Sequence, residues 1–135
     1  MPATKVFFDT NVLLYLLSND SSKADRATNL MKNGGNISVQ VLNELAAVCL
    51  RKLKMPYPEV RDLLWTIQKF CLVHPLTTHV NALGLELCER YQLGFYDALI
   101  VASALEADCK TLFSEDMQNG QVINQKLRIK NPFKS

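Results

Sequence analysis

Hydrophobic and polar residues follow two alternating patterns along the chain. Short apolar runs, typical of buried strands, are separated by longer segments in which apolar residues recur at helical spacing. The strand-like runs span 5–8, 36–39, 72–76, 110–113 and 122–133. The helix-like segments span 11–18, 21–35, 40–54, 58–71, 78–92 and 96–109. Strands that alternate with helices predict an α/β fold whose mostly parallel sheet is covered by helices on both faces.

The start of one helix and the place of the last strand can be predicted from single residues. Ser21 or Ser22 can cap the helix that follows, because a serine side chain accepts a hydrogen bond from the first turn. The last apolar run, within 122–133, predicts a final strand. This strand is expected at an edge of the sheet, because Pro132 lacks a backbone N–H and limits its far end.

Two acids stand at the ends of strand-like runs. Asp9 lies where the first run turns into a helix-like segment, in the sequence VFFDTNVLLYLL, and Asp116 follows the run at 110–113 in the same way. In open parallel sheets, ligands bind beyond the carboxyl ends of the strands. Both acids are therefore candidates for a site there, although Asp9 could cap the next helix and Asp116 could belong to a turn.

Two further acids interrupt apolar helix stripes. Glu44 lies three residues after Val41 and four before Val48, and Asp97 precedes apolar residues at i+3, i+4 and i+7. These spacings place both acids beside faces that should be buried. Asp97 could simply stabilise the start of its helix, and Glu44 could reach out to water. Such explanations account for each acid singly, but not for all four in this arrangement.

Convergent carboxylates repel one another unless a counter-charge is present. Hard oxygen ligands favour Mg²⁺ or Mn²⁺ over zinc, and such ions can activate water and neutralise charge on a phosphodiester. The chain offers no other recognisable nucleophile or nucleotide motif, since G-x-S-x-G, P-loop and G-x-G-x-x-G patterns are all absent. The pattern therefore favours metal-dependent phosphodiester hydrolysis.

An ordered set of motifs resembles the PIN-domain nucleases, with the greatest similarity to the VapC toxins of bacterial toxin–antitoxin pairs. The motifs are VFFDTNVLLYLL, then ISVQVLNELAAV, then GFYDALIVASALEADCKTLFSEDMQNG, and the resemblance runs from about Lys5 to Val122. It implies a three-layer α/β/α sandwich around a mostly parallel sheet. It also implies an RNA endonuclease that depends on Mg²⁺ or Mn²⁺, with structured RNA such as tRNA as a candidate substrate.

The resemblance also assigns roles to individual residues. Asp9, Glu44 and Asp97 match the family's invariant acidic metal ligands, and Asp116 matches a more variable fourth acid. The resemblance implies that Asn11 orients the site, and that Ser114 takes the place of a Ser or Thr that lines it. One departure is the sequence MQNG after the last acid, where many relatives carry an Asp-Phe pair.

The resemblance further implies a homodimer and a cognate antitoxin as protein partner. Five consecutive apolar residues, 13–17, exceed what one buried helix face needs, so part of this run could form a partner groove. The alternative is a helix buried on most sides. We expect an antitoxin to inhibit by placing an Arg or Lys side chain among the acids.

Basic residues gather in two places, although the net charge is only +2. Arg51, Lys52 and Lys54 form one cluster, which we expect to hold the RNA backbone. The other lies near the C-terminus and consists of Lys126, Arg128, Lys130 and Lys134. Either cluster could instead be an ordinary solvated surface.

The remaining totals describe an ordinary globular protein. With 135 residues, of which 48% are hydrophobic, one domain spanning 1–135 is expected. The four cysteines show no zinc-binding spacing and mostly lie among apolar residues, as expected for reduced thiols in the cytoplasm. No signal peptide is visible, and no apolar run is long enough to span a membrane.

Three other functions are open on the sequence alone. A phosphatase of the haloacid dehalogenase type also begins with a strand ending in Asp, but it needs a second Asp where this chain has Asn11. A degenerate PIN module could bind RNA or protein without catalysis, although such modules lose acids that this chain keeps. DNA is also possible as substrate, because metal-assisted chemistry does not distinguish it from RNA.

Overall fold

The computed structural model describes residues 5–134 and is built around a six-stranded sheet. The strand order is β3-β2-β1-β4-β6-β5, and every pairing is parallel except that between β5 and β6. The strands are β1 (Val6–Phe8), β2 (Gly35–Ser38), β3 (Cys71–His74), β4 (Thr111–Phe113), β5 (Val122–Ile123) and β6 (Leu127–Lys130).

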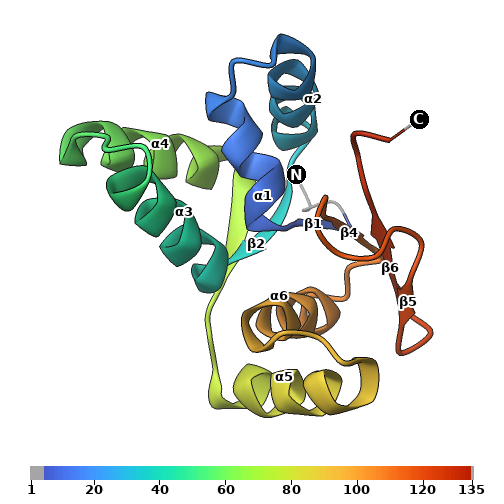
Figure 1. Cartoon of the computed structure of the whole chain (residues 1–135). Coiled ribbons are helices and arrows are strands. Elements are labelled where there is room, and N and C mark those ends of the chain that lie inside the picture. The colour runs from blue at the N-terminus through green and yellow to red at the C-terminus, as the bar shows by residue number, and fades with distance from the viewer. Residues whose placement is uncertain (1–4, 135) are drawn as a thin grey trace.

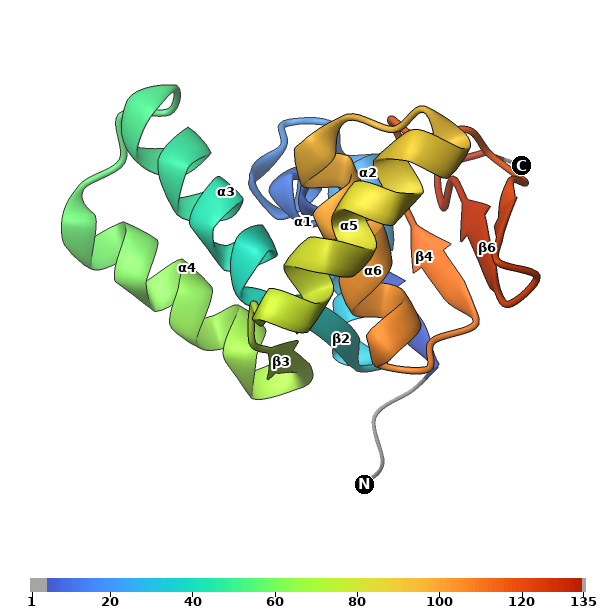
Figure 2. The ribbon, with the colours of Figure 1, turned by 90° about the horizontal axis from the view of Figure 1, so that it is seen from below.

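Helices cover both faces of this sheet. They are α1 (Thr10–Leu14), α2 (Ser21–Lys32), α3 (Val39–Arg51), α4 (Tyr57–Phe70), α5 (Thr78–Tyr91) and α6 (Phe95–Glu106), with a 3-10 turn, η1 (Tyr15–Leu17), after α1. Figure 1 shows α1 to α4 on one side of the sheet and α5 and α6 on the other. Figure 2, seen from below, shows α5 and α6 packed together and crossing the strands. The predicted α/β/α sandwich is confirmed.

The most buried helix is α6, which lies between the sheet and α5. Its residues 98–104 are all buried, as expected for a helix that is apolar nearly all round. Close contact with α5 depends on Gly84, because a Cβ atom there would lie 2.9 Å from Leu99 Cδ2. This packing fixes α6, and so determines where its first turn, with Asp97, emerges.

The C-terminal segment differs from the single edge strand that the sequence predicted. It forms a hairpin in which β5 is the edge strand and β6 lies inside it, parallel to β4. The chain reverses at Asn124 and Gln125, which both have positive φ angles (50° and 60°). Asn tolerates this conformation but Gln rarely does, so only half of the usual turn signal is present in the sequence.

The predicted cap of α2 was also wrong. Asp20, not Ser21 or Ser22, is the N-cap residue, and its Oδ1 accepts a hydrogen bond from Lys23 N at 3.2 Å. Aspartate caps a helix as well as serine does, so the residue types alone did not distinguish Asp20 from Ser21 or Ser22.

Two further expectations concern the cysteines and membrane-spanning segments. The four cysteines are all free, and Cys49, Cys71 and Cys109 are buried, as expected for reduced core thiols. Within residues 5–134, no helix is long and apolar enough to cross a membrane.

Candidate active site

Asp9 lies at the carboxyl end of β1 and is 3% exposed. It is the N-cap residue of α1, and its Oδ1 accepts a hydrogen bond from Thr10 N at 2.7 Å. Its Oδ2 accepts bonds from Ser114 Oγ at 2.8 Å and from Asn11 Nδ2 at 3.2 Å. Asp9 therefore caps α1 through Oδ1, as the capping explanation of this residue required. Its Oδ2, however, accepts hydrogen bonds from two side chains that take no part in capping.

Glu44 projects from the second turn of α3 and is half-buried. Its Oε1 accepts a hydrogen bond from Thr10 Oγ1 at 2.5 Å, and its Oε2 accepts one from Gln40 Nε2 at 3.0 Å. Thr10 thus connects the Asp9 segment to α3. Thr10 and Gln40 were not predicted as site residues, although Thr10 stands inside the D-T-N motif and Gln40 lies one helical turn before Glu44.

Asp97 is the third residue of α6, and its side chain is exposed. The N-cap residue of this helix is Gly94, and no side chain caps it, so Asp97 does not serve as the cap. Asp116 follows β4 and is also exposed. Both side chains are free to turn toward a ligand in solvent.

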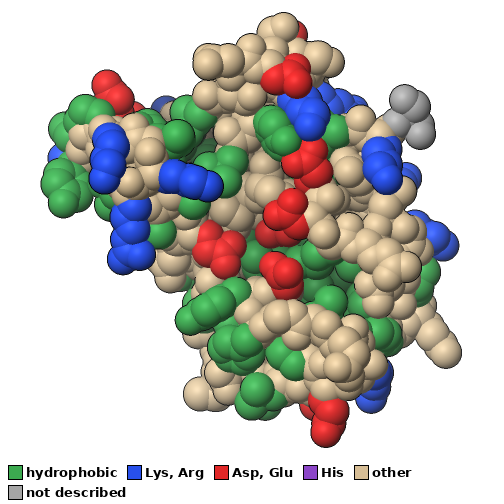
Figure 3. Space-filling model, in the orientation of Figure 1, with side chains coloured by type: hydrophobic (Ala, Val, Ile, Leu, Met, Phe, Trp, Pro, Cys, Tyr) green, Lys and Arg blue, Asp and Glu red, His purple; other side chains and the backbone are tan. Residues whose placement is uncertain are grey.

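The four acids influence one another electrostatically. The pKa of Asp9 is raised to about 6, chiefly by burial and also by the charges of Asp97 and Glu44, while the hydrogen bonds from Ser114 and Thr10 act in the opposite direction. Burial also raises the pKa of Asp97, with the charges of Glu44 and Asp116 adding to the effect. Figure 3 shows acidic side chains running across the middle of this face. The structure therefore places Asp9, Glu44 and Asp116 within electrostatic reach of Asp97.

The chemistry of this cluster suits a hard divalent cation, because every donor is a carboxylate oxygen. Among residues 5–134, no Lys or Arg forms an ion pair with any of the four acids. In the same part of the chain, there is no group of three or more Asp, Glu, His or Cys side chains that could hold a metal ion in the present arrangement. The donor set fits a divalent ion, but its side chains would have to draw together around it.

Glu115, between Ser114 and Asp116, is held by residues other than the four acids. Its carboxylate accepts hydrogen bonds from Tyr15 Oη at 2.6 Å and from Lys23 Nζ at 2.9 Å. Its backbone N–H donates to Asn11 Oδ1 at 3.0 Å. The hydrogen bond from Tyr15 and the charge of Lys23 lower the pKa of Glu115. These contacts, which the sequence did not predict, anchor the loop that carries Asp116.

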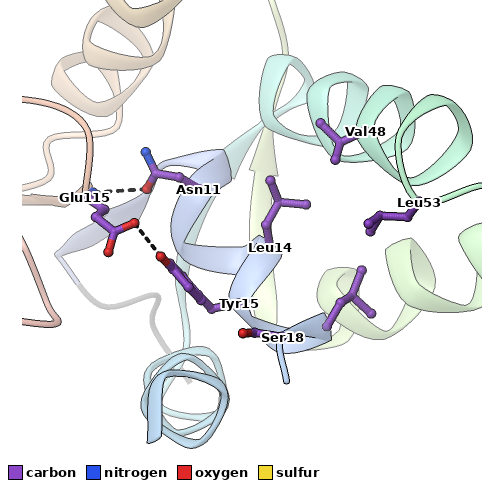
Figure 4. Close-up of a pocket in the computed structure, with 8 residues that line it drawn as sticks. Asn11, Leu14, Tyr15, Ser18, Val48, Leu53 and Glu115 are labelled. Atoms are coloured by element: carbon purple, nitrogen blue, oxygen red, sulfur yellow. Dashed lines mark hydrogen bonds between the residues drawn. The ribbon is translucent and has the colours of Figure 1, made fainter. Parts of the chain in front are cut away.

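A largely apolar pocket of about 320 Å³ lies beside the acids. Figure 4 shows Asn11 and Glu115 on one side of it, and Val48 and Leu53 on the other. Leu14 and Leu17, from the apolar run at 13–17, also line it. Part of that run is therefore not covered by the fold, as the groove interpretation predicted.

The predicted RNA-binding residues lie apart from the acids. Arg51, Lys52 and Lys54 are exposed at the end of α3 and in the connection to α4. Figure 3 shows basic side chains at this end of the face, separate from the acidic run. The C-terminal cluster, 126–134, is also exposed and flanks or belongs to β6.

Ser114→Ala tests the electrostatics of Asp9. Removal of the Ser114 hydroxyl should raise the pKa of Asp9 above about 6, because its hydrogen bond stabilises the ionised form. The pKa can be followed by carboxyl-carbon NMR in metal-free protein. Ser103→Ala is a matched control, since Ser103 is buried and its Oγ has no hydrogen-bond partner among the described residues. An unchanged pKa in Ser114→Ala would contradict the assignment.

Comparisons with known proteins agree on the fold. A toxin–antitoxin complex from Klebsiella pneumoniae has a TM-score of 0.73 and 17% identity, covering 96% of this chain and 99% of that one. VapBC2 from Rickettsia felis, bound to a DNA fragment from its promoter, has a TM-score of 0.67 and 21% identity, covering 93% and 97%. The sarcin–ricin loop cleaving toxin VapC20 of Mycobacterium tuberculosis has a TM-score of 0.67 and 16% identity, covering 82% and 89%.

At such identities these likenesses establish the fold only. No curated protein sequence matches the chain. The PIN domain family model, however, matches residues 6–119, which include all four acids and most of the described chain. The chain therefore belongs to the PIN domain family.

Proposed function

We propose that this protein is a metal-dependent endoribonuclease that hydrolyses phosphodiester bonds in RNA. The observation that carries the proposal is the convergence of four acids from separate segments, Asp9, Glu44, Asp97 and Asp116, where burial and mutual repulsion raise the pKa values of Asp9 and Asp97. Membership of the PIN domain family supports the same conclusion. So does the fold shared with a toxin described as cleaving the sarcin–ricin loop.

In this proposal the four acids hold Mg²⁺ or Mn²⁺. A bound ion would activate water for attack and neutralise charge on the phosphodiester. The chain's own polar residues prepare the donors. Thr10 and Gln40 each occupy one oxygen of Glu44, and Ser114 fixes Oδ2 of Asp9. These contacts limit how the carboxylates of Asp9 and Glu44 can turn.

The exposed basic residues would hold the RNA backbone on either side of this space. Arg51, Lys52 and Lys54 have no ion-pair partner within residues 5–134, so their charge is available to phosphates. The C-terminal basic residues, 126–134, are a second candidate contact. A structured RNA such as tRNA could reach both.

We further propose that the protein is the toxin of a toxin–antitoxin pair and acts as a homodimer. The pocket beside the acids supports the antitoxin part, because its apolar lining opens next to Asn11 and Glu115. A segment of the antitoxin would fill the pocket and place an Arg or Lys side chain among the four acids. A structure of the complex tests this expectation. An acidic site that stays fully open in that complex would contradict it.

The function itself is tested by incubating purified protein with total cellular RNA and Mg²⁺ or Mn²⁺, with and without chelator. Discrete fragments, mapped at their ends, are expected only when metal is present. Glu44→Gln should lose this cleavage, whereas Glu86→Gln, on the exposed side of α5, should keep it. If wild type does not cleave any RNA while it still binds Mn²⁺, the proposal of catalysis is wrong and a binding module is favoured.

A further inference from the structure

The outer face of α4 turns two large aromatic side chains to solvent. Tyr57 is 68% exposed and Trp65 is 67% exposed, the largest values among large hydrophobic side chains of the described residues. The opposite side of the helix is buried, since Val60 is 5% exposed and Ile67 is fully covered. Packing within the fold therefore gives no reason for a tryptophan and a tyrosine at these positions.

Cations alternate with these aromatics along the helix. Arg61 and Lys69 are exposed, and the order Tyr57, Arg61, Trp65, Lys69 repeats every four residues. Residues four apart lie on one side of a helix, about 6 Å apart along its axis, so the stripe is about 18 Å long. We name these four residues the α4 stripe. The same helix also carries two exposed acids, Glu59 and Asp62.

The groups of the α4 stripe are not engaged elsewhere in the described part of the chain. Neither Arg61 nor Lys69 forms an ion pair there. Neither aromatic ring contacts another aromatic ring or lies under a cation, because the ring contacts of residues 5–134 occur at other positions. Both ring faces and both charges are therefore available to a ligand.

We infer that the α4 stripe binds unpaired RNA, with bases stacking on Trp65 and Tyr57 and phosphates contacting Arg61 and Lys69. Aromatic platforms interleaved with cations are the usual means of binding single-stranded nucleic acid. Protein interfaces are also enriched in Trp, Tyr and Arg, but they are depleted of lysine, and Lys69 belongs to the stripe. The inference rests on the proposed function and extends it, because it names a region of the substrate that is single-stranded and lies away from the cleaved bond.

The position of α4 connects the stripe to the acidic site. Figures 1 and 2 show α3 and α4 side by side, with α4 on the outer side of α3. Lys54 precedes Tyr57 by only three residues, so the basic cluster at the end of α3 leads directly into the stripe. An RNA strand leaving the acids along α3 would pass this cluster before it reached α4.

Trp65 is the only tryptophan of the chain, so its own fluorescence reports on the stripe. The protein is titrated, with chelator present to prevent cleavage, with a fluorescein-labelled single-stranded RNA whose anisotropy gives the affinity independently. Binding should quench the fluorescence of Trp65, and a duplex of the same sequence should quench it less. Trp65→Ala should weaken binding of the single strand about tenfold. Trp65→Phe, which keeps an aromatic face, should restore most of that loss.

Leu85→Ala is the matched control, because Leu85 is 57% exposed on α5, and its affinity should stay within twofold of wild type. RNA binding without any change in Trp65 fluorescence, and with unchanged affinity in Trp65→Ala, would overturn the inference and leave the proposed function intact. A fluorescence change that depends on protein concentration without RNA would instead identify a contact between copies and overturn it. No RNA binding at all would overturn the proposed function as well.

Discussion

Asp9→Asn is expected to reduce RNA cleavage by a factor of about 10² to 10³ or more, while the protein remains at least as stable at pH 7. The loss follows because Asn offers one neutral oxygen where Asp9 offers a charged one to a cation. The gain in stability follows because Asp9 is 3% exposed and its pKa is raised to about 6, so its charge opposes folding at neutral pH. Asn has nearly the same shape, and removal of the buried charge should outweigh the hydrogen bonds that its amide nitrogen cannot accept.

Two measurements on the same preparation test this pair of effects. Cleavage rates at saturating Mg²⁺ give the first, and urea unfolding in chelator gives the second. Asp25→Asn, on the exposed side of α2, is the matched control and should change neither quantity. A variant at Asp9 that cleaves at the wild-type rate would remove Asp9 from the catalytic group. A variant that loses cleavage only because it unfolds would show that its role is structural.

The second large effect concerns stability as a function of pH. Asp9 has a pKa of about 6 in the folded protein, against the ordinary aspartate value of 3.8 that applies to the unfolded chain. Between these values the folded protein binds a proton that the unfolded chain has released. The free energy of unfolding of the metal-free protein should therefore fall as pH rises through this window. For a pKa shift of this size, the free energy of unfolding of the wild type should fall by about 2–3 kcal/mol more than that of Asp9→Asn over the same pH range.

A divalent ion should reverse this loss above pH 6, because it binds the ionised carboxylates of the folded state. At a free concentration of about 100 times its Kd, an ion that binds only the folded protein stabilises it by about 2.7 kcal/mol. Chemical unfolding from about pH 4 to about pH 8, with chelator and with Mg²⁺ or Mn²⁺, checks both statements. Wild-type and Asp9→Asn curves that stay parallel across the window would show that Asp9 is not the group responsible.

The sequence predicted the layers of the fold and the acids because both depend on simple periodicities. Glu44 was found because it falls between Val41 and Val48 on an apolar helix stripe, where a carboxylate is unusual. Asp9 was found because it ends a buried strand. The convergence of the two, through Thr10, could not be predicted, because it depends on how α3 packs against α1 and on which hydroxyl happens to face Glu44.

Other features escaped the sequence because tertiary contacts decide them. Glu115 was given no role by the sequence, yet Tyr15 and Lys23 hold its carboxylate across about a hundred residues of sequence. The residues of the α4 stripe are spaced like those on any solvent-facing side of a helix. Only the exposure of Trp65 in the folded chain sets it apart from a residue that packs on a neighbour.

The route by which the acidic cluster is assembled has a consequence for folding. Ser114 holds Asp9 across 105 residues of sequence, and β1 pairs with β4 only when most of the chain has been made. Such distant contacts form late, because closing a long loop is unfavourable until other contacts support it. A nascent or truncated chain that lacks β4 therefore contains Asp9, Glu44 and even Asp97, but it does not hold their side chains in the arrangement of the folded site. If the protein is a toxin, its harmful activity would begin only when folding is nearly complete, and partial products would be harmless.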